Sequence, residues 1–275
     1  MSSEPLLESG SLNYGSYLHL DEWLGAQQPA SRPAHHDELL FIVQHQTTEL
    51  WLKLVIHELS SAAERFAADD PATALKRIAR VKHIQETMTQ QWSVLATLTP
   101  SEYSEFRGAL GTSSGFQSYQ YRVVEFLLGN KKAELLQVFD KQPEAQAAVR
   151  AALEAPSLYD EFLRWAARTG IAIPAAVLER DVTKAYVVND ELIDVFAGVY
   201  EHPDQHWAVY EACEELVDLE DNFQLWRFRH LRTVQRTIGM GTGTGGSAGV
   251  KFLERALSIT FFPELFEVRT RISAL

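Results

Sequence analysis

The chain is poor in cysteine: Cys213 is the only one among its 275 residues. A lone cysteine excludes an internal disulfide and a cysteine-rich metal site. Scarce cysteine also suits a protein of a reducing compartment, so we expect a cytoplasmic location. The fold is therefore predicted to depend on packing and hydrogen bonds.

Basic charge and long apolar runs are also scarce. The chain has 25 Lys and Arg residues against 37 Asp and Glu, a formal net charge of −12, which disfavours nucleic acid and anionic membranes as partners. No run of about eighteen apolar residues occurs, and residues 1–17 do not read as an export signal. We expect no nucleic-acid partner and no membrane association, and a small molecule as the ligand.

What the chain does contain is a helical pattern along most of its length, because apolar residues recur every three or four positions. Residues 37–66 and 71–99 are predicted to form two long helices that Asp70 and Pro71 separate, and that should lie antiparallel. The other predicted helices span 101–107, 116–128, parts of 131–153, 157–168, 189–199 and a long segment from Pro203 to Gly239. Strand signals are nearly absent. The prediction is an all-α bundle of long antiparallel helices with short accessory ones, in a single domain over residues 1–275.

Residues 239–249 contain six glycines. Gly241, Gly243 and Gly246 have the G-x-G-x-x-G spacing of a dinucleotide site. That motif requires a preceding strand and a βαβ unit, whereas an amphipathic helix precedes it here. We interpret the segment as a lid loop, whose side-chain donors are Thr242, Thr244 and Ser247.

Histidines supply the first candidates for chemistry. His45 lies on the first long helix among apolar neighbours, where it is either a core histidine or a functional one, and Glu49 one turn later faces Lys53. His230 lies near the end of the last long helix, either as an axial metal ligand with apolar walls or as a histidine that the helix C-terminus favours. His202 and His206 are four residues apart at a predicted helix start, where a capping turn explains them better than a metal site.

Tyr103 and Arg107 are one turn apart on a short predicted helix. This spacing places a phenol hydroxyl and a guanidinium on one face. An arginine in this position can bind a small-molecule carboxylate through two hydrogen bonds, or it can cover apolar neighbours at the surface.

Together these segments resemble the tryptophan 2,3-dioxygenase family, from about Tyr14 to Arg269 and in the family's order. The matching blocks are FIVQHQTTELW (41–51), SEYSEFR (101–107), SSGFQSYQYR (113–122), DLEDNFQLWRFRH (218–230) and GTGG (243–246). The resemblance implies an all-α enzyme that opens the indole C2–C3 bond of L-tryptophan with O₂ to give N-formylkynurenine, the first step of tryptophan catabolism. It also implies one non-covalent haem b per subunit, which agrees with the absence of the C-x-x-C-H motif.

The resemblance assigns roles to individual residues. His230 matches the axial iron ligand, and His45 matches the catalytic distal histidine that bonds to the indole N–H. The remaining matches are Phe41 (indole pocket), Tyr103 and Arg107 (substrate carboxylate), Thr244 (substrate amino and carboxylate groups), and Ser114, Gly115 and Trp92 (haem pocket). The family is typically a homotetramer, a dimer of dimers. Residues 1–20 would then contribute Tyr14, Tyr17 and Leu18 to the substrate site of a neighbouring subunit.

Two segments depart from the family pattern. Residues 240–242 are Met-Gly-Thr where the family usually has basic residues, and residues 180–186 read RDVTKAY where the family has R-D-W-T-Q. Some relatives add one oxygen atom to a substituted indole and give an oxindole in secondary metabolism, so this reaction is an alternative. A haem sensor or carrier without turnover is a further alternative, although such a protein has no evident need for the His45 and Arg107 side chains.

Overall fold

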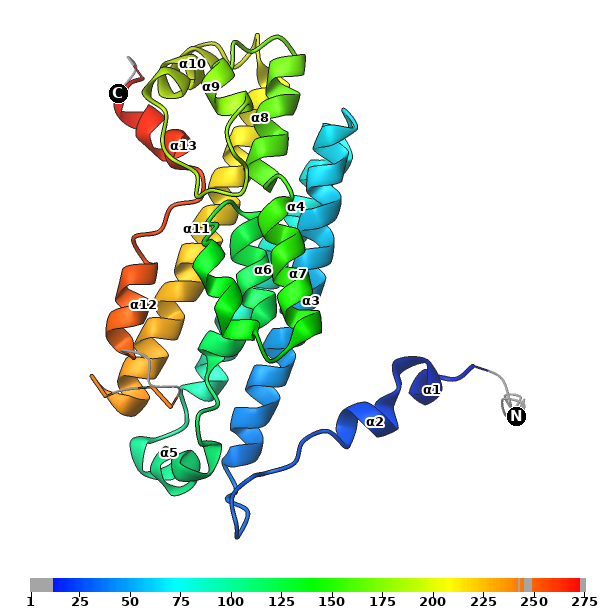
Figure 1. The fold of residues 1–275 in the computed structure, drawn as a ribbon, viewed down its shortest axis with the longest axis vertical. Coiled ribbons are helices and arrows are strands. Elements are labelled where there is room, and N and C mark those ends of the chain that lie inside the picture. Colours follow the sequence, from blue (N-terminus) through cyan, green and yellow to red (C-terminus); the bar gives the residue numbers. More distant parts are fainter. Residues whose placement is uncertain (1–11, 242, 245–248, 273–275) are drawn as a thin grey trace, which may run out of the picture.

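The computed structural model describes residues 12–241, 243–244 and 249–272. Its body is formed by the long helices α3 (Glu38–Ala67), α4 (Pro71–Leu95) and α11 (Trp207–Ile238) (Figure 1). The shorter α-helices are α1 (Tyr14–Leu18), α2 (Leu20–Leu24), α5 (Pro100–Arg107), α6 (Tyr119–Leu127), α7 (Pro143–Glu154), α8 (Leu158–Arg168), α9 (Ala175–Leu178), α10 (Asp190–Glu201), α12 (Val250–Ala256) and α13 (Pro263–Glu267). The 3₁₀ helices are η1 (Gly108–Leu110), η2 (Gly115–Gln117), η3 (Ala133–Phe139) and η4 (Val268–Thr270). The described residues contain no β-strand, and none of their helices combines the length and apolar character that crossing a bilayer requires.

A short turn at residues 68–70 reverses the chain between α3 and α4. The Asp70 carboxylate accepts the backbone N–H of Thr73 at 3.2 Å and caps α4, as predicted. Glu58, near the end of α3, forms ion pairs with Arg80 at 2.7 Å and Arg77 at 3.7 Å, near the start of α4. The two helices therefore lie antiparallel.

Helix α11 packs against α4 in the parallel sense. Lys82 of α4 lies 2.9 Å from Asp218 of α11, and further along both helices Arg229 of α11 donates a hydrogen bond to the Ser93 hydroxyl at 3.2 Å. The shorter elements between residues 96 and 206 return the chain to the end at which α4 began. The C-terminal halves of α4 and α11 consequently lie side by side.

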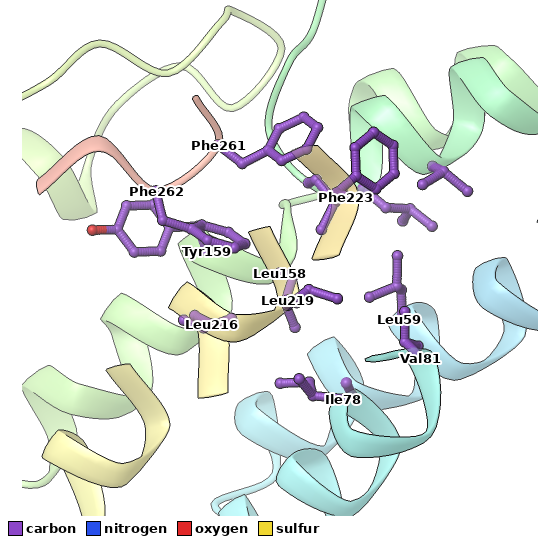
Figure 2. Close-up of a cluster of buried hydrophobic side chains, with 14 of the residues drawn as sticks. Leu59, Ile78, Val81, Leu158, Tyr159, Leu216, Leu219, Phe223, Phe261 and Phe262 are labelled. Atoms are coloured by element: carbon purple, nitrogen blue, oxygen red, sulfur yellow. The ribbon is translucent and has the colours of Figure 1, made fainter. Parts of the chain in front are cut away.

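The hydrophobic core lies where the long helices meet α8 and the segment before α13 (Figure 2). The buried side chains labelled there are Leu59 of α3, Ile78 and Val81 of α4, Leu158 and Tyr159 of α8, Leu216, Leu219 and Phe223 of α11, and Phe261 and Phe262. Their spacing of three or four residues on each long helix is the amphipathic pattern seen in the sequence.

Polar side chains of α11 hold the segment 259–262, which crosses this helix after α12. Glu220 accepts two backbone N–H groups of the segment, both at 2.9 Å. Gln224 and Arg227 donate to a carbonyl of the same segment at 2.7 and 3.1 Å. Buried backbone groups without partners would be costly, so these bonds permit non-helical chain to pack here.

A second buried carboxylate, that of Glu264 in α13, joins three parts of the chain. It accepts the hydroxyls of Tyr159 at 3.0 Å and Tyr186 at 2.9 Å, and the backbone N–H of Asn189 at 2.7 Å. Burial raises the pKa of Glu264 above its ordinary value, against the opposing effect of these hydrogen bonds. This side chain fastens the C-terminal helices to α8 and to the start of α10.

Helices α1 and α2 form an N-terminal arm, residues 12–25, that lies apart from the bundle (Figure 1). Just after the arm, Gln27 donates to the side chain of Gln46 on α3 at 2.5 Å. Within the arm, Tyr14 is 76% exposed and Tyr17 is 67% exposed. These side chains do not contribute to the core of their own chain.

The predicted helices differ from the observed ones mainly at their ends, whereas α1, α2, α12 and α13 were not predicted. The last long helix begins at Trp207, because residues 203–206 form a turn and His206 occupies the N-cap position. His202 ends α10, so the two histidines flank a turn between helices, in agreement with the capping-turn interpretation. The segment 170–188, read as irregular, contains the short helix α9.

The Glu264 contacts predict a large effect on stability. Glu264→Ala leaves the buried donors of Tyr159, Tyr186 and Asn189 without their acceptor, so we expect the free energy of unfolding to fall by about 2–5 kcal/mol. Urea denaturation followed by circular dichroism measures this change. Glu267→Ala, at an exposed position of the same helix, should change it by less than about 0.5 kcal/mol. Equal midpoints for the two variants would contradict the role of Glu264.

Candidate active site

Aromatic side chains of α3 and α5 meet at one end of the bundle. The ring centroid of Phe41 lies 4.2 Å from that of His45, 5.9 Å from that of Tyr103 and 5.7 Å from that of Phe106. Three of these residues were predicted to belong to the substrate site, and the structure brings them together. Phe106 was not predicted, although its spacing from Tyr103 places it on the same side of α5.

Helix α5 presents Tyr103 and Arg107 together, as the one-turn spacing predicts. A capping box between Thr99 and Glu102 fixes the start of this short helix. The guanidinium carbon of Arg107 lies 6.0 Å from the centre of the Tyr103 ring. Burial raises the pKa of Tyr103, so its hydroxyl stays protonated at neutral pH and can donate a hydrogen bond.

The ring of His45 is held by its own helix. Its Nδ1 lies 2.7 Å from the carbonyl oxygen of Phe41, one turn earlier. Because a carbonyl only accepts, Nδ1 carries the proton and Nε2 of the neutral ring is left as an acceptor. Burial lowers the pKa of His45 below its ordinary value, so the ring is neutral at pH 7.

His230 faces the same region from α11. Its ring stacks on Trp92 of α4, with centroids 4.4 Å apart and planes 8° from parallel, and Trp226, one turn earlier on α11, lies 5.6 Å away. Burial, with the nearby His45 ring as a smaller cause, lowers the pKa of His230 to about 4. The rings of His45 on α3 and His230 on α11 therefore lie near each other.

A buried ion-pair network supports the site behind Trp226. Arg122 and Arg227 both donate to Glu125, at 2.5 and 3.3 Å, and all three side chains are buried. The ring of Tyr121 lies 5.7 Å from Trp226. Burial, with the Glu125 charge as a smaller cause, raises the pKa of Tyr121 to about 12. Glu125, Arg227 and the ion pairs between them were not predicted from the sequence. The one sequence signal for this part of the site was Trp226, which precedes His230 by one helical turn.

Ser114 and Gly115 lie near the glycine-rich loop. The Ser114 hydroxyl accepts the N–H of Phe116 and caps η2, which Gly115 begins. The Thr244 hydroxyl donates to the carbonyl oxygen of Ser113. The predicted haem-pocket segment and the predicted lid threonine are thus in contact.

The glycines at the ends of the loop allow two turns and a close backbone contact. Gly239 ends α11 with φ 59°, and Gly249 precedes α12 with φ 55°, both in the left-handed region that favours glycine. A Cβ on Gly249 would lie 2.3 Å from the carbonyl oxygen of Gly241, so no larger residue fits there. Thr242, Gly246 and Ser247 lie outside the described residues. Because a helix precedes the loop, the dinucleotide interpretation has no structural support.

Tyr14, Tyr17 and Leu18 lie on the arm, and the structure does not bring them to the site of their own chain. Glu49 forms no ion pair with Lys53 among the described residues. Instead, its carboxylate and its backbone carbonyl both accept the Gln120 amide at 2.8 Å, which joins α3 to α6 one turn from His45.

Comparison with known proteins identifies the family. The model of the family described as tryptophan 2,3-dioxygenase matches residues 3–198 and 193–272. The chain belongs to this family.

Proteins named tryptophan 2,3-dioxygenase from three bacteria illustrate the similarity. The protein of Arthrobacter sp. strain FB24 is 66% identical over 264 residues, covering 96% of this chain and 93% of its own length. That of Kineococcus radiotolerans is 66% identical over 263 residues, with 96% and 92% covered. That of Xanthomonas euvesicatoria pv. vesicatoria is 59% identical over 263 residues, with 96% and 88% covered.

Membership of the tryptophan 2,3-dioxygenase family implies a haem, and the described residues fit one. The ring nitrogens of His230 make no hydrogen bond to any described protein group. The indole N–H groups of Trp92 and Trp226 are buried and have no hydrogen-bond partner within residues 12–241, 243–244 and 249–272. His45 faces this region with Nε2 as an acceptor. An imidazole nitrogen inside aromatic walls is a donor set that suits a haem iron.

The altered segment 180–186 contacts residues that were not predicted to belong to the site. Arg180 donates to the Asp160 carboxylate at 2.6 and 2.8 Å, while Tyr186 contacts Glu264 and its N–H bonds to the carbonyl oxygen of Gly129. None of these partners is a predicted site residue. This departure from the family pattern therefore contributes to the packing of α8 and α13.

Proposed function

We propose that this enzyme inserts both atoms of O₂ across the indole C2–C3 bond of L-tryptophan and releases N-formylkynurenine, with the residues at the α3–α5–α11 end of the bundle as its active site. The family assignment supports the reaction. The observation that supports the site is the placement of His45 and His230 on opposite helices, with Phe41, Tyr103 and Arg107 beside His45.

In this proposal each subunit holds one haem b without a covalent bond, and His230 is the axial ligand. When bound, the haem supplies the iron that activates O₂. Trp92 supports the His230 ring, and the segment containing Ser114 and Gly115 contributes to the haem pocket.

His45 positions the substrate indole. Its Nε2 lacks a proton because Nδ1 donates to Phe41, so Nε2 can accept a hydrogen bond from the indole N–H. Indole N–H is a very weak acid, and a neutral imidazole is too weak a base to deprotonate it. His45 therefore holds the ring in place, and Phe41 packs against it.

The amino-acid part of the substrate requires charged and polar partners. Arg107 binds the carboxylate through two charge-assisted hydrogen bonds, and Tyr103 donates a third from its protonated hydroxyl. Thr244 contacts the amino and carboxylate groups from the glycine-rich loop and thereby helps to exclude water. This recognition favours tryptophan over free indole, because an indole lacking these groups leaves Arg107 without its anion.

We also propose that the N-terminal arm completes the site of a second subunit in a homotetramer. The exposure of Tyr14, Tyr17 and Leu18, at 76, 67 and 41%, supports this assignment. Apolar and aromatic side chains on a segment apart from its own bundle gain burial only against another chain.

The reaction itself is tested by product mass. Haem-loaded, reduced protein is mixed with L-tryptophan under isotopically labelled O₂, and we expect one ring-opened product that contains both labelled atoms. Incorporation of one labelled atom would assign the chain to the oxindole-forming alternative. Unchanged tryptophan together with an unchanged haem spectrum would indicate a carrier or sensor.

The carboxylate contact predicts a selective effect of Arg107→Leu. A hydrogen bond to a charged group contributes about 1.5–3 kcal/mol, so KM for L-tryptophan should rise roughly 10- to 100-fold. Steady-state kinetics measure the change, with kcat as the less affected parameter. Tryptamine, which has no carboxylate, is the control, and its KM should stay within about twofold because Arg107 makes no bond to it. An equal loss for both substrates would contradict the assignment.

The arm predicts complementation between defective subunits. A chain lacking residues 1–18 has lost Tyr14, Tyr17 and Leu18 from its arm, and an Arg107→Leu chain has a defective site but an intact arm. After the two are unfolded and refolded together, activity should exceed the sum of the separately refolded samples, because some sites receive both an intact Arg107 and a partner's arm. Additive activities, with mixed oligomers demonstrated by mass spectrometry, would show that the arm does not act across subunits.

A further inference from the structure

The two histidines of the site are held in different ways. Nδ1 of His45 donates to the carbonyl oxygen of Phe41, which lies four residues earlier on the same helix. His230 lies four residues after Trp226 on α11, yet its ring makes no hydrogen bond to a described protein group. A histidine ligand usually donates its second ring N–H to a carboxylate, carbonyl or water, which fixes the ring orientation. No protein group among the described residues does this for His230.

Instead of such a hydrogen bond, the His230 ring has a stacking contact with an aromatic side chain. The His230 and Trp92 rings are 4.4 Å apart and only 8° from parallel. Trp226 touches the His230 ring at 45° and lies 5.9 Å from Trp92. Stacked or tilted aromatic contacts restrict rotation of a ring about its Cβ–Cγ bond, because rotation would break the contact or force the rings to overlap. The angle of the imidazole plane is therefore determined by α4, through Trp92.

Buried neighbours also hold the stacked rings of Trp92 and His230 in place. Trp92 is only 4% exposed and Trp226 only 7%, so neither ring is free to turn. Near this point the Ser93 hydroxyl accepts a hydrogen bond from Arg229, which fixes the register of α4 on α11. Trp92 thus lies opposite His230 because the two helices run parallel in this register.

We propose that Trp92 is a positioning residue that sets the orientation of the His230 imidazole by ring stacking, in place of a hydrogen bond to protein. This inference rests on the proposed function, in which His230 is the axial ligand. The indole N–H of Trp92 makes no hydrogen bond to the part of the chain that the structure describes, so we assign the effect to the face of the ring. Another flat ring of sufficient size should replace it, whereas a branched aliphatic side chain should not.

The test compares Trp92→Phe and Trp92→Leu in the haem-loaded protein. One measurement is the rate of haem transfer to excess apomyoglobin, and the other is the iron–histidine stretching band of the reduced protein in resonance Raman spectra. For Trp92→Leu we expect transfer to accelerate by about tenfold or more, as for loss of a group that orients a metal ligand, and the Raman band to broaden and shift. Trp92→Phe should transfer haem within about threefold of the wild-type rate and keep a sharp band.

Two controls separate this effect from other causes. Trp165→Leu removes a buried tryptophan that packs on Phe66 at the opposite end of α3. This variant should match Trp92→Leu in lost thermal stability and retain the wild-type band and transfer rate. In His230→Gly the band should disappear and return with added imidazole.

Each outcome addresses a different claim. If the band survives in His230→Gly without imidazole, the ligand assignment fails. If the band depends on His230 but is identical in Trp92→Leu and the wild type, the ligand assignment holds and the positioning role of Trp92 is wrong. Equal defects in Trp92→Phe and Trp92→Leu would likewise overturn the proposal, because they would assign the effect to the indole N–H.

Discussion

The parallel packing of α4 against α11 is the contact on which the rest of the structure depends. Parallel neighbours in an all-helical chain require a long connection, and residues 96–206 provide it while contributing α5 and α6. Helix α3 reverses directly into α4 and therefore begins near the place where α11 ends. One packing arrangement thus determines which helix ends meet, and His45 and His230 lie at those ends.

Buried carboxylates hold segments outside the long helices in place through hydrogen bonds. Glu220 accepts two donors from a non-helical segment, and Glu264 accepts donors from α8 and from residues 186–189. Glu125 neutralises one of two buried arginines. Single partners would not repay the removal of these carboxylates from water, whereas multiple hydrogen bonds can. The short C-terminal helices stay in place on α11 through such contacts in addition to their small apolar faces.

Most helices were predictable from local patterns, whereas the roles of the site residues were predicted from the resemblance to the family. The spacing in α3, α4 and α11 and the Asp70–Pro71 start carried the secondary structure, and short-range spacing correctly joined Tyr103 to Arg107. The parallel sense of α4 and α11 was not predictable, because no local pattern encodes which helix faces which after a connection of this length. The contacts of Glu49 with Gln120 and of Trp92 with His230 were missed for the same reason, since their partners are far apart in sequence.

The close contact between the backbones of Gly241 and Gly249 has a consequence for how the loop between them can vary in length. The backbones of these two residues lie close together, so the chain that joins α11 to α12 leaves and returns at nearly the same place. The entropic cost of closing a loop rises only slowly with its length. Changes of length between Gly241 and Gly249 would therefore add little to the cost of closing this loop, so the chain can vary in length here while the long helices keep their packing.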